Sequence, residues 1–257
     1  MLLVIDIGNT NVVTGLFQQD KLVATWRMAT QVHKTSDEYM VLLASFFSYR
    51  GLGARDVQSV VIASVVPPLI PVFEDVCRRY LQQTPLVVGP GIRTGVRILY
   101  ENPKEVGADR IANALAAYKL HGGPAIIIDF GTATTFDAIS REGDYLGGAI
   151  APGIEIASEA LFEHTAKLPR VELSRPKQAI GRNTVASMQS GILFGYVGLV
   201  EGMVARIKQE LGGTAKVLAT GGLADIVARE SRVIEVVDHH ITLIGLRLMH
   251  ELQEHRT

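Results

Sequence analysis

Two segments of the chain carry the same arrangement of residues that could bind phosphate and its metal. Asp6–Thr10 (Asp-Ile-Gly-Asn-Thr) follows the apolar run 2–5, and Asp129–Thr135 (Asp-Phe-Gly-Thr-Ala-Thr-Thr) follows the apolar run 125–128. In each segment a buried strand is expected to end in a carboxylate, and a glycine turn with small hydroxyl or amide side chains follows. Glycine lets the backbone approach an anion closely, so that successive N–H groups and hydroxyls can bind phosphate oxygens. Because a carboxylate repels phosphate, each aspartate is expected to act through a cation or its bound water.

A third segment, residues 100–110, could supply a general base. It reads Tyr-Glu-Asn-Pro-Lys-Glu-Val-Gly-Ala-Asp-Arg and is predicted to open a helix over residues 103–120. Glycine inside a helix costs about 1 kcal/mol relative to alanine, so Gly107 indicates a close approach by another group. Asp109 could accept the proton of a substrate hydroxyl, while Arg110 could bind phosphate or position the acceptor. A surface ion pair beside a packing glycine is the alternative, and the two aspartate turns favour the functional interpretation.

The segment Ala219–Gly222 (Ala-Thr-Gly-Gly) is a further candidate for nucleotide binding. It follows an expected strand and opens an expected helix, where backbone N–H groups can bind a nucleotide. Glycines at such a junction can equally serve close packing of the strand against the helix. The sequence leaves both interpretations open.

The elements predicted around the two aspartate turns repeat in the same order. The turns begin at residues 6 and 129, close to half the chain apart. In the first half, strands are expected at 2–6, 11–17 and 21–27, then a helix at 36–49, a strand at 58–63, a helix at 68–81, a strand at 85–88 and a helix at 103–120. In the second half, strands are expected at 124–129, 133–139 and 144–150, then helices at 153–165 and 183–211, a strand at 215–219, a helix at 222–229, a strand at 233–237 and a helix at 240–254. This order predicts a duplicated α/β fold in which each half brings one aspartate turn to a cleft.

The composition argues against several other classes of protein. The net charge of the 257 residues is −1, so no global electrostatic attraction to nucleic acid or to an anionic membrane is expected. The single cysteine, Cys77, excludes an internal disulfide, and no Cys/His spacing is typical of a zinc site. Neither a signal peptide nor a stretch of about 18 apolar residues is evident, and we therefore expect a cytoplasmic protein that does not enter a membrane.

In their order along the chain, these segments resemble those of the type III pantothenate kinases, a family of the superfamily that contains acetate and sugar kinases, Hsp70 and actin. The matching segments cover nearly the whole chain and are Asp6–Asn11, Ala63–Pro68, Asn102–Pro103, Gly107–Arg110, Asp129–Thr135, Gly147–Gly153, Asn183–Thr184, Ser190–Gly191 and Ala219–Gly222. The superfamily motif alone would indicate only nucleotide handling, whereas Gly107–Arg110 together with Asp129–Thr135 is typical of this one family.

The resemblance implies a fold and an activity. The fold would be α/β, a duplicated ribonuclease H-like (actin-like ATPase) fold of two lobes, each with a mixed sheet flanked by helices. Residues 1–120 would form the N-terminal lobe with the first phosphate turn and the acceptor-site helix, and residues 121–257 the C-terminal lobe with the second turn and the Thr-Gly-Gly motif. The activity would be ATP-dependent phosphorylation of pantothenate to 4′-phosphopantothenate, the first step of coenzyme A biosynthesis, carried out by a homodimer.

The resemblance also implies roles for individual residues. Asp109 would be the general base for the primary hydroxyl of pantothenate, Asp6 would hold magnesium through water, and Asp129 would hold a potassium or ammonium ion. The residues implied to bind ATP are Asp6, Ile7, Gly8, Asn9, Thr10, Asn11, Val12, Val13 and Thr132. Those implied to bind pantothenate are Tyr100, Gly107, Ala108, Asp109, Arg110 and Thr184, and the last of these could reach the site from the other copy in a dimer.

Three other functions are compatible with parts of this pattern. A kinase of the same fold could phosphorylate another small hydroxy acid or a sugar, although Gly107–Arg110 argues against that. An actin- or Hsp70-like ATPase would need inserted subdomains for which 257 residues leave no room. A non-catalytic regulator of transcription related to this family would be expected to have lost Asp109 or the second turn, and both are intact.

Overall fold

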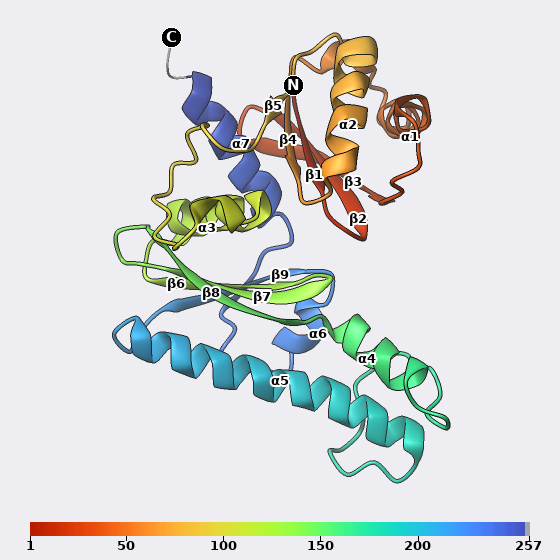
Figure 1. Cartoon of the computed structure of the whole chain (residues 1–257), viewed down its shortest axis with the longest axis vertical. Coiled ribbons are helices and arrows are strands. Elements are labelled where there is room, and N and C mark those ends of the chain that lie inside the picture. Colours follow the sequence, from red (N-terminus) through yellow and green to blue (C-terminus); the bar gives the residue numbers. More distant parts are fainter. Residues whose placement is uncertain (255–257) are drawn as a thin grey trace. The chain divides into compact units, whose positions relative to one another are not determined.

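Two five-stranded mixed sheets organise the protein, whose structure is a computed structural model that describes residues 1–254. Contacts between residues divide the chain into two units, and each unit contains one of the sheets (Figure 1). The first unit contains residues 1–96, residues 101–116 and helix α7 (Ile241–Glu254). The second unit contains residues 97–100 and 117–240.

The first sheet has the strand order β3-β2-β1-β4-β5. Its strands are β1 (Leu2–Ile7), β2 (Asn11–Gln18), β3 (Lys21–Ala29), β4 (Ser59–Ser64) and β5 (Leu86–Val87). β1, β2 and β3 are antiparallel neighbours, whereas β4 is parallel to β1 and β5 is parallel to β4. The parallel pairing brings the carboxyl ends of β1 and β4 to one edge of the sheet, which is where ligands bind in open α/β sheets.

Helices cover both faces of the first sheet (Figure 1). Side chains alternate between the two faces along β1, so Leu3, Ile5 and Ile7 share one fully buried core with residues of α1 (Ser36–Tyr49) and α2 (Ile70–Val76). Helix α7 contacts β1, β2 and β4 from the other face, where Leu243 approaches Gly15 of β2.

The second sheet repeats this plan with the strand order β10-β9-β6-β7-β8. Its strands are β6 (Ala125–Phe130), β7 (Ala133–Ile139), β8 (Tyr145–Pro152), β9 (Lys216–Gly221) and β10 (Val236–Val237). β6, β7 and β8 are antiparallel neighbours, and β9 and β10 extend the sheet in parallel from β6. The aspartate turn after β6 therefore occupies the same topological position as the one after β1.

Helix α5 (Thr184–Glu210) covers one face of the second sheet (Figure 1). Met188, Ile192, Val200 and Val204 recur at helical spacing on its buried side and pack into one core with β6, β7 and β9. The shorter helices α4 (Ile154–Glu163) and α6 (Ala224–Ala228) contact α5, and α3 (Ala108–His121) connects the first unit to the second along the chain.

Length and composition alone would allow α5 to cross a membrane. Its most apolar window of 18 residues has a mean hydropathy of 1.3, which differs from the expectation that no stretch of the chain is apolar enough. However, 44% of that window is buried inside the protein, and the buried side chains belong to the core of the second unit. The core helix of a soluble protein passes the same test of length and composition, and packing in the core accounts for the buried part of this window.

The predicted duplicated α/β fold is confirmed, because each unit contains three antiparallel strands followed by parallel ones and flanking helices. The predicted helix over 103–120 is wrong at its beginning. Residues 103–105 form a separate 3₁₀ turn capped by Asn102, Val106 is extended, and α3 begins only at Ala108. The C-terminal helix α7 belongs to the unit of the first sheet by its contacts, although it follows the second half in sequence.

Candidate active site

The first aspartate turn joins β1 to β2 and is held closed by hydrogen bonds from its own backbone and from the end of β3. The Gly8 N–H donates to the Asn11 carbonyl at 3.0 Å, and the Thr30 hydroxyl donates to the Gly8 carbonyl at 2.6 Å. A β-carbon at residue 8 would lie 3.1 Å from the Asn11 carbonyl oxygen, so the turn has little room for a side chain there. Asn9 and Thr10 at its tip are exposed.

The residues predicted to bind ATP, Asp6–Val13, are not all able to contact a ligand in the same way. Ile7 and Val12 are fully buried in the core, so only their backbone atoms could contact a nucleotide. Asp6 is partly exposed and pairs in the sheet with Val13 of β2 and Ala63 of β4. Its carboxylate therefore belongs to the carboxyl-end edge of β1.

The second turn is packed against the Thr-Gly-Gly segment at the end of β9. Parallel pairing places Asp129 beside Thr220 and Phe130 beside Gly221. Gly221 has a φ of +92°, a conformation that favours glycine, and a β-carbon there would lie 2.7 Å from Oδ1 of Asp129. The third candidate segment thus lies at the second aspartate turn, and Gly221 has a packing reason to be glycine.

The end of β8 approaches the second turn from its other side. A β-carbon on Gly153 would meet the carbonyl oxygen of Gly131 at 2.7 Å and would also overlap that of Thr132. The side chain of Thr132 is exposed, while Asp129 is partly exposed. The turn therefore has a carboxylate, an exposed threonine and several carbonyl oxygens within a few residues.

Asp109 lies in the first turn of α3 because that helix begins later than predicted. The first helical hydrogen bond runs from the Ile111 N–H to the Gly107 carbonyl at 3.2 Å, and Oδ1 of Asp109 accepts the Arg110 N–H at 2.8 Å. Burial raises the pKa of the Asp109 carboxyl, and this effect outweighs the N–H group and the positive charge of Arg110, which both lower it. A carboxylate with a raised pKa is a stronger proton acceptor than an ordinary aspartate.

The segment that carries Asp109 lies beside the edge that carries the first turn. A β-carbon at Gly107 would lie 3.7 Å from Cγ1 of Val65, which follows β4 directly. The Val65 N–H in turn donates to the carbonyl of Ile7, the last residue of β1, at 3.0 Å. The first unit therefore brings Gly107–Arg110 and Asp6–Thr10 to one edge of its sheet.

Two predicted acceptor-site residues belong to the second unit. Tyr100 is partly exposed, and its ring packs beside Gly147 of β8 and the ring of Tyr145. Thr184 is exposed at the first position of α5, where the Asn183 side chain caps the helix by accepting the Ala186 N–H at 2.8 Å. Within the second unit, Thr184 lies on α5 and not at the aspartate turn.

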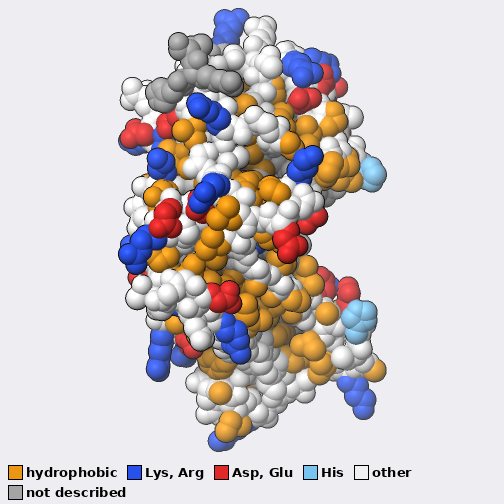
Figure 2. Space-filling view, turned by 60° about the vertical axis from the view of Figure 1, so that its left-hand side comes forward, with side chains coloured by type: hydrophobic (Ala, Val, Ile, Leu, Met, Phe, Trp, Pro, Cys, Tyr) orange, Lys and Arg blue, Asp and Glu red, His pale blue; other side chains and the backbone are white. Residues whose placement is uncertain are grey.

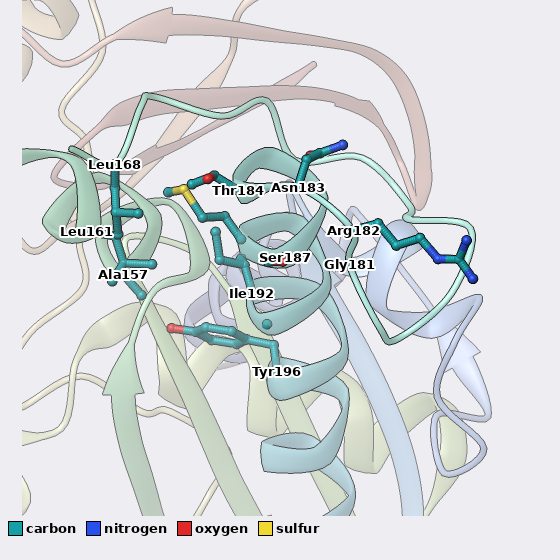
Figure 3. A pocket seen from close by; sticks show the side chains of 12 residues that line it. Ala157, Leu161, Leu168, Gly181, Arg182, Asn183, Thr184, Ser187, Ile192 and Tyr196 are labelled. Carbon is teal, nitrogen blue, oxygen red and sulfur yellow. The ribbon is translucent and has the colours of Figure 1, made fainter.

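Thr184 lines a cavity that sequence reasoning did not predict. The cavity has a volume of about 850 Å³ and lies between α4, α5 and the segment that joins them. Figure 3 shows Ala157, Leu161 and Leu168 on one side of it, with Ile192 and Tyr196 of α5 on the other. Most of these side chains are apolar and recur at helical spacing. Such a pattern is the same for a buried core and for a groove, so the sequence did not indicate the cavity.

The charges of the surface agree with a small anionic ligand better than with nucleic acid. On the face that Figure 2 shows, basic and acidic side chains are interspersed, and Lys and Arg form no continuous field there. Among residues 1–254, no group of three or more His, Cys, Asp or Glu could hold a metal ion. A cation at the second turn would therefore bind one carboxylate together with carbonyl oxygens, hydroxyls or water.

Comparisons with known proteins give a consistent result. The sequence model of the family described as type III pantothenate kinase matches residues 2–206. A protein of Moorella thermoacetica described as a type III pantothenate kinase is 55% identical over 251 residues, which cover 98% of this chain and 99% of that protein. One of Myxococcus xanthus with the same description is 54% identical and covers 97% of this chain and 98% of its own length.

Solved structures share the fold at low sequence identity. A Campylobacter jejuni protein described as a candidate Baf family transcriptional activator has a TM-score of 0.63 at 19% identity, covering 98% of this chain and 99% of its own. The inorganic polyphosphate/ATP-glucomannokinase of Arthrobacter sp. strain KM has a TM-score of 0.52 at 16% identity and covers 98% of both chains. At these identities the likeness concerns the fold alone.

Proposed function

The chain belongs to the type III pantothenate kinase family, and we propose that Asp109 is the general base with which it phosphorylates pantothenate from magnesium-ATP. Transfer of a phosphoryl group to a primary hydroxyl requires in-line positioning, neutralisation of charge and removal of the hydroxyl proton. The observation that carries the assignment is the position of the Asp109 carboxylate beside Gly107, at the sheet edge that also holds the first aspartate turn. The raised pKa of this carboxyl supports the same role.

The nucleotide phosphates bind to the segment Asp6–Val13 and to Thr132 in this proposal. The closed turn at Gly8 and the exposed Asn9 and Thr10 support it, because small side chains and backbone N–H groups suit phosphate oxygens. Asp6 acts through water on the magnesium ion that accompanies ATP, since a direct contact between a carboxylate and phosphate would be repulsive.

Asp129 holds a potassium or ammonium ion in this proposal. The groups at this turn fit such an ion, because oxygen donors are the ligands that monovalent cations take in proteins. Oδ1 of Asp129 and the carbonyl oxygen of Phe130 both lie within 2.7 Å of the position that a β-carbon on Gly221 would take. A bound cation would supply positive charge near the transferred phosphoryl group. Asp129 and Thr132 would then hold the ion and the phosphate oxygens in fixed relative positions.

Pantothenate contacts Tyr100, Gly107, Ala108, Arg110 and Thr184 in this proposal. The chemistry of the residues supports it, since Arg110 offers positive charge to the acid and Tyr100 offers an aromatic ring with a partly exposed surface. Gly107 and Ala108 leave room for an acceptor beside Asp109.

We further propose that the enzyme is a cytoplasmic homodimer that pairs through α5. Gly191, Gly195 and Gly198 are exposed on that helix, and within the described chain nothing beyond the neighbouring helix backbone lies within 4 Å of where their β-carbons would be. Small residues along an exposed stripe let a second helix approach closely. Thr184, at the start of the same helix, would then lie next to the partner copy.

One assay tests the substrate assignment. The purified protein is incubated with ATP, magnesium, potassium and a panel of hydroxyl acceptors that includes pantothenate, sugars and small hydroxy acids, and phosphorylated products are measured by mass. Phosphopantothenate is the expected product. Turnover of another alcohol without turnover of pantothenate would leave the fold assignment intact and overturn the substrate.

A further inference from the structure

The four residues Arg97–Tyr100 form an additional strand-like edge on the second sheet. They are the only residues before position 117 that belong to the second unit. The Tyr145 N–H donates to the Arg97 carbonyl at 2.9 Å, the Leu99 N–H donates to the Tyr145 carbonyl at 2.8 Å, and Ile98 forms a parallel bridge with Tyr145. Because β8 is the edge strand of this sheet, the segment occupies backbone groups that would otherwise be exposed.

An ion pair fixes the beginning of this segment. Nε of Arg97 donates to Oδ1 of Asp144 at 2.9 Å, and Nη2 donates to Oδ2 at 2.6 Å, which is the bidentate arrangement that gives both energy and direction. Asp144 is only 9% exposed, and its backbone N–H and carbonyl are both hydrogen-bonded to Ser140. The position of its carboxylate is therefore well defined. The Arg97 guanidinium lowers the pKa of the Asp144 carboxyl, which keeps the pair ionised at neutral pH.

Tyr145 supports the same segment from inside the unit. Its side chain is fully buried, and its hydroxyl donates to Oδ1 of the buried Asp137 at 2.8 Å. This hydrogen bond holds the ring of Tyr145, whose centroid lies 6.3 Å from that of Tyr100 with the two planes at 54°.

The ring of Tyr100 rests on the backbone of Gly147. A β-carbon at residue 147 would lie 3.3 Å from Cε2 of Tyr100, and Gly147 has a φ of +119°. Tyr100 is 36% exposed, so its packed side is fixed while the rest of the ring remains available to a ligand.

We propose that Arg97, through its ion pair with Asp144, is a positioning residue that sets the ring of Tyr100 against Gly147 for the acceptor. This inference rests on the proposed function, in which Tyr100 contacts pantothenate. Arg97 does not touch the substrate, and its effect passes through three residues of chain to the ring. The Arg97–Asp144 ion pair therefore contributes to the binding of pantothenate and not to the binding of ATP.

Steady-state kinetics of single and double variants test the proposal. Arg97→Met is expected to raise the KM for pantothenate about three- to tenfold, with the KM for ATP and the kcat within about twofold of wild type. Arg97→Lys keeps the charge without the bidentate geometry and is expected to give an intermediate KM. In a Tyr100→Ala background, Arg97→Met is expected to have no further effect on this KM, because the two changes act on one contact.

A matched control comes from a second ion pair of the same unit. Arg175 is exposed like Arg97, and it pairs with the largely buried Glu230 at 2.6 Å. Arg175→Met is expected to leave the KM for pantothenate unchanged, and melting temperatures show whether each variant is folded. If Arg97→Met does not fold, Asp144→Asn in the wild-type and Tyr100→Ala backgrounds gives the same comparison, since it removes the charge of the other partner of the ion pair.

The outcomes separate this inference from the proposed function. If Tyr100→Ala leaves the KM for pantothenate unchanged, Tyr100 is not an acceptor contact, and that part of the proposed function fails together with the inference. If Tyr100→Ala raises this KM but Arg97→Met does not, the acceptor contact stands and the positioning role is overturned. Fully additive effects in the double variant, or an equal rise in the KM for ATP, would also overturn it.

Discussion

Oδ1 of Asp109 lies so close to the position of a β-carbon on Gly107 that the two atoms could not both be accommodated. Any side chain at residue 107 would therefore displace the carboxylate that we assign as the general base. Cγ1 of Val65 lies 3.7 Å from that position, which is an ordinary packing distance. Glycine is therefore required at residue 107 because of the nearby carboxylate. The helix does not require it, since α3 begins only at Ala108.

Gly107→Ala is expected to reduce kcat by about 10²-fold or more, approaching the loss caused by removal of the base, because the Asp109 side chain must leave its position. The melting temperature is expected to change little, since a side chain rather than the backbone has to move. Gly53→Ala is the control: Gly53 has a φ of −139° and, within the described chain, no atom within 4 Å of the position of its β-carbon. Near-normal turnover of Gly107→Ala would show that the observed position of the carboxylate is not the reactive one.

Asp109→Asn is expected to bind ATP normally and to lose about 10²–10⁴-fold in kcat, which is the usual contribution of a general base. In the wild-type enzyme, kcat/KM for pantothenate is expected to fall at acid pH with an inflection above 3.8, because burial raises the pKa of this carboxyl. A pH–rate profile and nucleotide-binding measurements on both proteins check these expectations. A variant that keeps its turnover would remove Asp109 from the role.

Asp109 also makes stability depend on pH in a defined direction. Its pKa is raised in the folded protein above the ordinary value of 3.8, so the folded state holds the proton more tightly than the unfolded state. The free energy of unfolding therefore falls as the pH rises from 3.8 through the folded-state pKa, and the full cost of ionising this buried group is present at neutral pH. Asn can still accept the Arg110 N–H but carries no charge, so Asp109→Asn is expected to melt at a higher temperature than wild type at neutral pH. The difference should shrink towards pH 4; a difference that does not depend on pH would contradict this account.

The sequence predicted the two aspartate turns and their strands well because both signals are local. Apolar runs such as 125–128 end at an aspartate and a glycine, and the structure has β6 and its turn at that position. The beginning of α3 was not predictable in the same way. Asn102 and Pro103 are typical of a helix start, and they do start a 3₁₀ turn, but extended Val106 separates that turn from the helix.

Contacts between distant parts of the chain were beyond the sequence pattern. Helix α7 is amphipathic in sequence, but its place in the first unit depends on contacts such as that of Gly245 with the backbone of Ala112, where a β-carbon would overlap a carbonyl oxygen. The packing of Tyr100 on Gly147 depends in the same way on an edge that forms only in the folded sheet. Composition and periodicity carry no information about either contact.

The proposed potassium or ammonium ion at Asp129 can be distinguished from the magnesium ion of ATP by its dependence on the monovalent salt. At constant magnesium and ionic strength, turnover is expected with potassium or ammonium and not with sodium, because sodium binds oxygen ligands at shorter distances. Asp129→Asn is expected to lose the response to potassium while it keeps its fold. Turnover titrated against each chloride salt checks this, and equal activity in all three salts would refute the assignment.

The homodimer is tested most directly on the exposed glycines of α5. Gly195→Leu adds a side chain where the protomer has open space, so the protomer is expected to fold normally while the approach of a partner helix is blocked. Multi-angle light scattering is expected to show a dimer for wild type and a monomer for this variant. If Thr184 serves the site of the partner copy, turnover of pantothenate falls together with the loss of the dimer. Ser48→Leu, a change at an exposed position of α1, is expected to leave both properties unaltered. A monomeric wild type, or a Gly195→Leu dimer with full activity, would exclude this helix as the interface.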